Sequence, residues 1–192
     1  MHMTNAIAQL LEVATPQHGL FTVAQADEAG IGAANLRNMA ARGTLERRAH
    51  GVYRIPQVPI DEHTELMEAV LWAKGRGTIA GETALLLWDF ADVNPRKIHL
   101  TVPPKYRPRR QGGELYCVHH ADLGPADRDE VDGVPVANPE TAIRQAITYG
   151  VDGDLVAQAI RRAQAREFIG GLTAARLLVE LEDRAVRRHT RG

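Results

Sequence analysis

The sequence predicts an α+β protein, with a winged helix-turn-helix at its N-terminus and a mixed α/β region behind it that ends in helices. Three observations predict this class. Apolar residues recur every three to four positions up to about residue 43, a short basic hairpin pattern follows, and alternating strand-like runs appear only beyond about residue 97. Because Pro56 and Pro59 disfavour regular structure, we predict two domains, over residues 1–58 and 59–192.

The first two helices are indicated by apolar spacing and by a capping signal. Ile7 and Leu10 begin the apolar stripe of a first helix, and a short extended piece follows it. The segment from Thr22 to Gln25 fits a capping box, in which two side chains satisfy free backbone amides at a helix start. We therefore expect a second helix from there to Ala29.

A third helix is predicted to end before Gly43. Leu36 and Met39 fall on one side of this helix, whereas Arg37 and Asn38 fall on the other. Gly43 suits the position just after a helix, where the backbone commonly takes a positive φ. The outer face of the helix is thus small, basic and amide-bearing.

A basic hairpin is predicted next, with strands over residues 44–49 and 52–55 and Gly51 in the tight turn. Arginine and asparagine on a helix can read guanine and adenine edges in a major groove, and hairpin cations can contact phosphates or a minor groove. A merely solvated basic face is the alternative. We favour DNA binding because the helix and hairpin follow two further helices in the order of a winged helix. The residues predicted to contact DNA are Ala34, Asn35, Arg37, Asn38, Arg42, Arg47, Arg48, His50 and Arg54.

The second domain is predicted to mix helices and strands. Asp61 can cap a helix that ends at Gly75, and a further helix is expected over residues 82–88. The later elements are strands over residues 97–102, 114–119 and 131–136, and helices over residues 139–149, 154–168 and 173–188.

Charge is small overall and uneven along the chain. A formal net charge of -1 argues against a wholly basic nucleic-acid-binding surface, so such binding must come from local patches. Acidic residues gather over residues 122–132 near Gly124 and Pro125, and we expect a solvated loop there rather than a magnesium site.

The lone Cys117 excludes an intramolecular disulfide and a cysteine-rich zinc site, and it fits a reducing cytoplasm. No apolar run is long enough to span a bilayer, and the N-terminus lacks the apolar core of a signal peptide. We therefore expect a cytoplasmic protein with no membrane partner.

Signatures of catalysis are absent from the sequence. His119-His120 together with Glu114 or His99 suggest a metal site, yet no HExxH motif or cysteine pair accompanies them. There is no P-loop, Rossmann glycine pattern, GxSxG motif or acidic-x-lysine nuclease element. We predict no catalytic residues, no metal and no cofactor.

Four short segments carry a family resemblance. They read RAHGVYRI at residues 48–55, IAGETAL at 79–85, IHLTVP at 98–103 and GVPVANPE at 133–140. Together they resemble the AbiEi-type antitoxins, close to the MenA-type members, in order and over nearly the whole chain. The family commonly has an Arg-Thr pair and then an Asp after the last segment, whereas this chain has Thr141-Ala142 and Gln145.

The resemblance implies the antitoxin of a type IV toxin–antitoxin pair rather than the toxin, whose GS…DxD signature is absent. The N-terminal domain would bind inverted repeats in its own promoter and repress it. The C-terminal domain would counteract a nucleotidyltransferase-fold toxin. Two copies are expected on a palindromic operator, and a monomer is possible in solution. Charge complementarity predicts these partner-binding residues: Lys105, Arg107, Arg109, Arg110, Arg184, Arg187 and Arg188.

Two other functions stay open at this point. A stand-alone transcription regulator would sense a small ligand in a deep apolar pocket of the second domain. A nucleic-acid enzyme would use the winged helix for targeting, although the missing catalytic signatures weigh against it.

Overall fold

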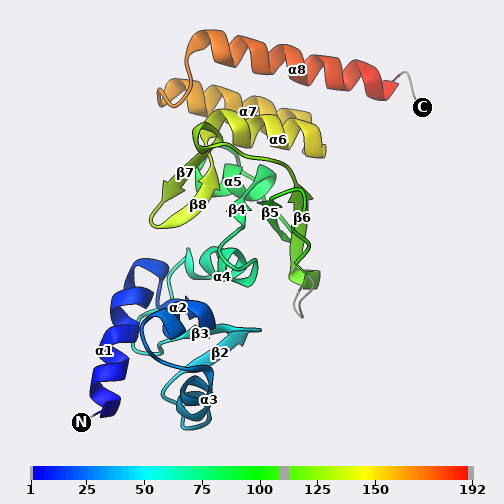
Figure 1. Ribbon diagram of the computed structural model, residues 1–192. Coiled ribbons are helices and arrows are strands. Elements are labelled where there is room, and N and C mark those ends of the chain that lie inside the picture. Colours follow the sequence, from blue (N-terminus) through cyan, green and yellow to red (C-terminus); the bar gives the residue numbers. More distant parts are fainter. Residues whose placement is uncertain (1, 109–112, 190–192) are drawn as a thin grey trace. The chain divides into compact units, whose positions relative to one another are not determined.

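The computed structural model describes residues 2–108 and 113–189 (Figure 1). Its mixture of helices and strands confirms the predicted α+β class. The helices are α1 (His2–Ala14), α2 (Val23–Glu28), α3 (Ala33–Ala41), α4 (Thr64–Trp72), α5 (Gly81–Leu87), α6 (Pro139–Tyr149), α7 (Gly153–Ala165) and α8 (Gly171–His189). The strands are β1 (Leu20–Thr22), β2 (Glu46–Ala49), β3 (Val52–Arg54), β4 (Thr78–Ile79), β5 (Ile98–Val102), β6 (Tyr116–His120), β7 (Arg128–Val131) and β8 (Val134–Ala137).

The chain divides into two compact units. The first comprises Met1–Gly77, Lys105–Tyr116 and Asp132–Val134, and the second comprises Thr78–Pro104, Cys117–Val131 and Pro135–Gly192. The boundary predicted between residues 58 and 59 falls inside the first unit, because α4 packs against strands β1, β2 and β3. Independent folding of residues 1–58 stays a prediction.

The first unit contains a three-stranded antiparallel sheet with strand order β1-β3-β2. Helices α1, α2 and α3 bury their apolar faces in a common core with this sheet. Leu10, Phe21, Leu36 and Ile55 are each fully enclosed in that core. Burial of such side chains stabilises the fold by roughly 1.5–3 kcal/mol each, so the predicted apolar stripes hold this part together.

Local signals in the sequence fix the boundaries of α2 and α3. Thr22 Oγ1 accepts a hydrogen bond from the Gln25 amide, and the Gln25 side chain accepts one from the Thr22 amide, which confirms the capping box. Gly43 takes a φ of +75°, and the amide of Thr44 bonds back to the Met39 carbonyl at 2.9 Å. The predicted stop of the third helix is thereby confirmed.

Helix α4 begins later than predicted. Its first residue is Thr64, and Asp61 lies in the turn before it. Asp61 Oδ1 accepts hydrogen bonds from the His63 amide at 3.0 Å and from Thr64 Oγ1 at 2.8 Å. Asp61 therefore orders the approach to the helix instead of capping it directly.

The second unit contains most of a five-stranded sheet with strand order β6-β5-β4-β8-β7. Strand β4 pairs antiparallel with β5 and parallel with β8. Helices α6, α7 and α8 pack against one another at the C-terminal end of the chain, as Figure 1 shows in yellow to red. This arrangement confirms the predicted helical end.

The single strand predicted over residues 131–136 is wrong, because β7 and β8 form a hairpin there. Asp132 and Gly133 make its turn with φ values of +46° and +83°. An Asp-Gly pair in this conformation is a common two-residue hairpin turn. Asp129 and Glu130 of the acidic run predicted as a loop therefore belong to β7, an edge strand whose residues 128–130 are exposed.

Gln145 on α6 joins this helix to the sheet. Its side chain is almost completely buried. Oε1 accepts a hydrogen bond from the Gly81 amide at 3.1 Å, and Nε2 donates to Thr101 Oγ1 at 3.2 Å. The departure from the resembled family at this position therefore still provides a satisfied, buried polar connection.

Candidate nucleic-acid interface

The outer face of α3 carries four of the residues predicted to contact DNA. Ala34, Asn35, Arg37 and Asn38 are all exposed, whereas Leu36 on the inner side is fully buried. A guanidinium and two amides on one helix face can donate hydrogen bonds to base edges in a major groove. Arg42, which directly follows the helix, is exposed as well.

The hairpin of β2 and β3 presents a second group of polar residues at the edge of its sheet. Arg47, Arg48 and His50 are exposed, and His50 lies at the turn. The strand pairing shifts between Arg47 and Ala49, so that Arg48 occupies a bulge. Successive side chains of a strand point to opposite faces, so Arg48 and its neighbour Arg47 are directed differently.

Arg54 does not belong to this surface, which corrects the prediction that it contacts DNA. The residue is only 4% exposed. Its Nη1 donates to Glu46 Oε2 at 3.0 Å, and its Nη2 donates to the Val58 carbonyl. Glu46 stands directly opposite Arg54 in the strand pairing. The guanidinium is enclosed and its charge is balanced, so it has a structural role in the hairpin.

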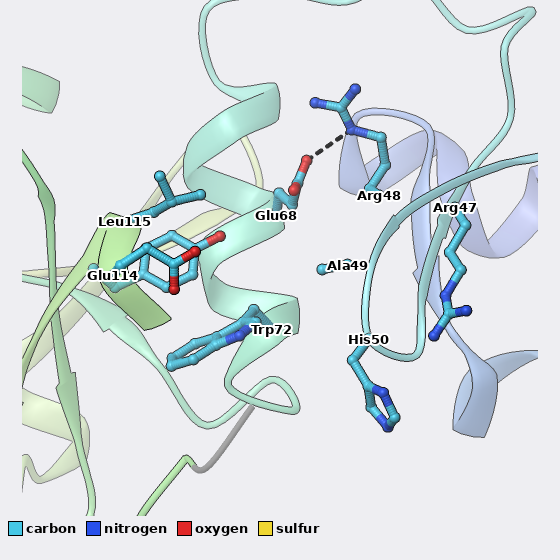
Figure 2. A pocket seen from close by; sticks show the side chains of 9 residues that line it. Arg47, Arg48, Ala49, His50, Glu68, Trp72, Glu114 and Leu115 are labelled. Carbon is cyan, nitrogen blue, oxygen red and sulfur yellow. Dashed lines mark hydrogen bonds and ion pairs between the residues drawn. The ribbon is translucent and has the colours of Figure 1, made fainter. Parts of the chain in front are cut away.

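Arg48 reaches into a hollow of about 390 Å³ beside the hairpin (Figure 2). Arg48 Nε lies 2.9 Å from Glu68 Oε2 on α4. The hydrogen bond to Glu68 raises the pKa of Arg48, although partial burial opposes the shift. Figure 2 shows Arg47 extending away from Glu68. The lining residues of the hollow are Arg47, Arg48, Ala49, His50, Glu68, Trp72, Glu114, Leu115 and Tyr116.

The character of this hollow is acidic and aromatic on the side opposite the hairpin. Glu68 and Glu114 disfavour a phosphate there, because like charges repel. Tyr116 packs on Trp72 with ring centroids 4.6 Å apart. Burial, and then the charges of Glu68 and Glu65, raise the pKa of Tyr116 to about 12. The hollow is therefore not a phosphate site, and Arg47 and His50 stay the predicted DNA contacts of the hairpin.

The cations predicted to bind a protein partner are divided between the two units. Lys105 and Arg107 belong to the first unit and are exposed, and Arg187 on α8 belongs to the second and is exposed too. Arg109 and Arg110, and the side chain of Arg188, lie outside the part of the chain that the structure describes. A partner contact by the exposed residues stays a prediction.

Arg184 anchors a helix, and a partner contact by this residue stays a prediction. It is partly buried, and its Nη1 donates to the carbonyls of Ile147 at 3.0 Å and Val151 at 2.8 Å. Helix α6 ends at Tyr149, so these carbonyls flank the C-terminal end of that helix. A cation is favourable at such an end, where carbonyls lack helical partners.

The structure also assembles three side chains that can bind a metal. His99 on β5 and His119 on β6 place Nδ1 and Nε2 3.2 Å apart, and Cys117 Sγ lies 3.5 Å from the same Nε2. Sequence reasoning considered the two histidines but not Cys117, although strand alternation puts residues 117 and 119 on one face. Burial lowers the pKa of His99. Burial, and then the charges of His99 and His120, lower the pKa of His119 to about 4.

Residues 8–56 match the family model described as "Transcriptional regulator, AbiEi antitoxin". The match spans α2, α3 and the hairpin, and over this segment it confirms the resemblance seen in the sequence. It supports a role as a transcriptional regulator or antitoxin, and the matched family is not a class of enzymes.

Comparisons of the whole chain add little to this match. A search of curated proteins gives no match. Among solved structures, the chain is similar to the crystal structure of the RV2827C protein from Mycobacterium tuberculosis, with 14% identity and a TM-score of 0.44 over 92% of this chain and 81% of that chain. Within the described residues, no helix combines the length and apolar character needed to cross a membrane.

Proposed function

We propose that this chain is an autoregulating antitoxin. Its N-terminal winged helix-turn-helix binds inverted repeats in its own promoter, and the remainder of the chain counteracts a nucleotidyltransferase toxin. The exposed polar face of α3 and the basic edge of the hairpin, both in the first unit, carry the DNA-binding part of this proposal. The family match over residues 8–56 supports the regulatory part.

In this proposal α3 is the recognition helix. Arg37 and Asn38 contact base edges, and the small side chain of Ala34 lets the helix approach the groove closely. Arg42 and Arg47 neutralise phosphates and give affinity without sequence preference. Base contacts and phosphate contacts are therefore separable by mutation.

DNA binding is tested with the full chain and two duplexes, its own promoter region and a scrambled sequence of equal length. Fluorescence anisotropy at several salt concentrations gives both affinity and salt dependence. Arg161→Ala is a matched control, because Arg161 is an exposed cation on α7 and is not among the predicted DNA contacts. Equal affinity of the wild type for both duplexes would contradict operator recognition. Sedimentation of the complex gives the number of copies bound, for which we expect two.

Antitoxin activity is tested by co-expressing the full chain with the product of the adjacent gene, scoring growth rescue and co-purification. Charge reversals at Lys105, Arg107 and Arg187 probe the predicted partner surfaces, with Arg161→Glu as the control. The intact chain is preferable to a fragment, because α4 packs on the strands that a fragment lacking the N-terminus would lose. Rescue that persists in every reversal would contradict a role for these cations.

A ligand-sensing regulator is the alternative function, and it requires a deep apolar pocket in the second unit. A hollow of about 410 Å³ lies between β6 and α6 in that unit. Its lining combines polar side chains such as Thr141 and Arg144 with Leu123 and the ring of Tyr149, and more of its surface is apolar than polar. The antitoxin proposal is retained because it is the one that the family match over residues 8–56 supports.

A further inference from the structure

We propose that His99, Cys117 and His119 form a zinc-binding site in the second unit, with a fourth coordination position open to water or to a donor from a bound partner. The inference does not rest on DNA binding or on toxin neutralisation. It departs from the sequence-based prediction of no metal, because the structure adds Cys117, the only cysteine of the chain, to two of the histidines.

Two of the three distances between these ligand atoms suit tetrahedral coordination. One nitrogen from each histidine and the cysteine sulfur all lie within 4.8 Å of one another. Zinc bonds of about 2.0–2.3 Å at tetrahedral angles place neighbouring ligand atoms about 3.3–3.6 Å apart. The observed separations are 3.2 Å between the two nitrogens and 3.5 Å between sulfur and nitrogen.

The surrounding fold holds the ligands in place. Strands β5 and β6 are neighbours in the sheet, and they supply His99 on one side and Cys117 with His119 on the other. The ring of His119 stacks on Tyr149 of α6, with centroids 3.5 Å apart and planes 4° from parallel. Ligands that are already ordered lose less conformational freedom when a metal binds.

The ligand set selects zinc by its chemistry. A thiolate and two imidazole nitrogens suit Zn²⁺, whereas Mg²⁺ and Ca²⁺ prefer oxygen ligands. Three protein ligands leave one position unfilled, unlike a closed structural zinc site. His119 also lines the hollow of about 410 Å³ between β6 and α6, which gives water or a partner side chain access to this position.

A hydrogen-bonded cluster without metal is the competing explanation for the same distances. In that case one imidazole N–H is shared between the histidines, and the thiol bonds weakly to His119. Cobalt(II) separates the two explanations, because it replaces zinc in tetrahedral sites and its bond to a thiolate gives a charge-transfer absorption band. Cys117 is the only cysteine in the chain, so any such band reports on this site.

The experiment titrates the full-length protein with Co²⁺ and then displaces the cobalt with Zn²⁺. We expect a thiolate band that saturates at one equivalent, disappears in Cys117→Ser, and requires at least about tenfold more cobalt in His99→Asn and His119→Asn. His120→Asn is the matched control, because His120 lies on the same strand outside the ligand group, and we expect it to behave like the wild type. A wild-type protein without the band would overturn the site, as would wild-type cobalt affinity in both the His99→Asn and His119→Asn proteins.

Alkylation of Cys117 in the wild type keeps the test decisive if the histidine variants fold poorly. A thiolate bound to zinc is shielded from iodoacetamide, so we expect alkylation to slow at least about tenfold with one equivalent of Zn²⁺. An unchanged alkylation rate with zinc would overturn the proposal. Circular dichroism of each variant without metal identifies any loss of fold.

Discussion

Helix α3 and the β2–β3 hairpin both carry arginine, but they use it differently. Helix α3 contains no carboxylate, and its Arg37 is exposed. In the hairpin region, Arg54 pairs with Glu46 and Arg48 pairs with Glu68. The number of arginines in a segment therefore overstates its basic surface wherever a carboxylate stands across the sheet or on a neighbouring helix. The variants below test this division between exposed and paired arginines.

Arg54→Ala is expected to have the largest effect, and the effect is on stability. Removal of a buried partner in an ion pair, with loss of packing around the guanidinium stem, lowers the free energy of unfolding by about 3 kcal/mol. Arg54→Met keeps the apolar volume without the charge, and we expect a loss of about 1 kcal/mol or less. Urea unfolding, monitored by circular dichroism, measures the free energy of unfolding of both variants.

Arg47→Ala is the control for this comparison, because Arg47 is an exposed residue on the same hairpin. The free energy of unfolding of this variant should stay within about 0.5 kcal/mol of the wild-type value. An Arg54→Ala protein with wild-type stability and lost operator binding would reverse the roles assigned to the two arginines.

Arg37→Ala is expected to have the second largest effect, and the effect is on base preference. Loss of a side chain that contacts a base edge costs about 1–3 kcal/mol of operator binding and relaxes preference at one position. Stability should hardly change, because Arg37 is exposed on the outer face of α3. Anisotropy with operator and scrambled duplexes measures the effect, and equal losses on both duplexes would contradict a base contact.

Local signals explain how much of this fold the sequence could predict. The capping box at Thr22 and the helix stop at Gly43 each depend on residues a few positions apart, and both are present. The role of Arg54 could not be predicted in this way, because it depends on the register that sets Glu46 opposite it. Arg48 and Glu68 lie 20 positions apart and meet only through packing of α4 on the sheet.

In the second unit, too, short-range sequence patterns could not predict every element or contact. Strand β7 has the sequence Arg-Asp-Glu-Val, which lacks the alternation of a half-buried strand because three of its four residues are exposed at the sheet edge. The Asp132-Gly133 pair was the available signal for this hairpin. The grouping of Cys117 with His99 required the neighbouring position of β5 and β6, which no short-range pattern contains.

Glu68→Gln is expected to have a smaller effect and to move the hairpin towards the behaviour of α3. Without its carboxylate partner, Arg48 becomes available to phosphates. The affinities for operator and for scrambled DNA should both rise about two- to fivefold. The slope of log affinity against log salt concentration should become steeper by about one, as expected for one additional phosphate contact. Glu65→Gln is the control, because it removes the same charge from the same helix without breaking the hydrogen bond to Arg48. Equal tightening in both variants would indicate a general charge effect and not release of Arg48.

The smallest effect is expected where a carboxylate pairs with a histidine, a third example in the first unit of a basic side chain held by an acidic partner. His18 Nδ1 lies 2.6 Å from Asp61 Oδ2, and His18 Nε2 lies 2.8 Å from the Asp132 carbonyl oxygen. The partner atoms on both sides of the ring are oxygens. Partial burial raises the pKa of Asp61, but hydrogen bonds from His18 and Thr64 outweigh it and lower the pKa to about 2.

Because the folded-state pKa of Asp61 lies below its unfolded value, the carboxylate stabilises the fold above about pH 4, and this contribution is lost as the pH falls through about 2. The stability difference between the wild type and Asp61→Asn should therefore shrink as urea unfolding is repeated from pH 5 down towards pH 2. Glu62→Gln, at the exposed neighbouring position, should show no such narrowing. If the difference in unfolding free energy between the wild type and Asp61→Asn stays constant over this range, the carboxylate does not stabilise this unit through its pairing with His18. Pairing with a carboxylate would then matter only around the hairpin.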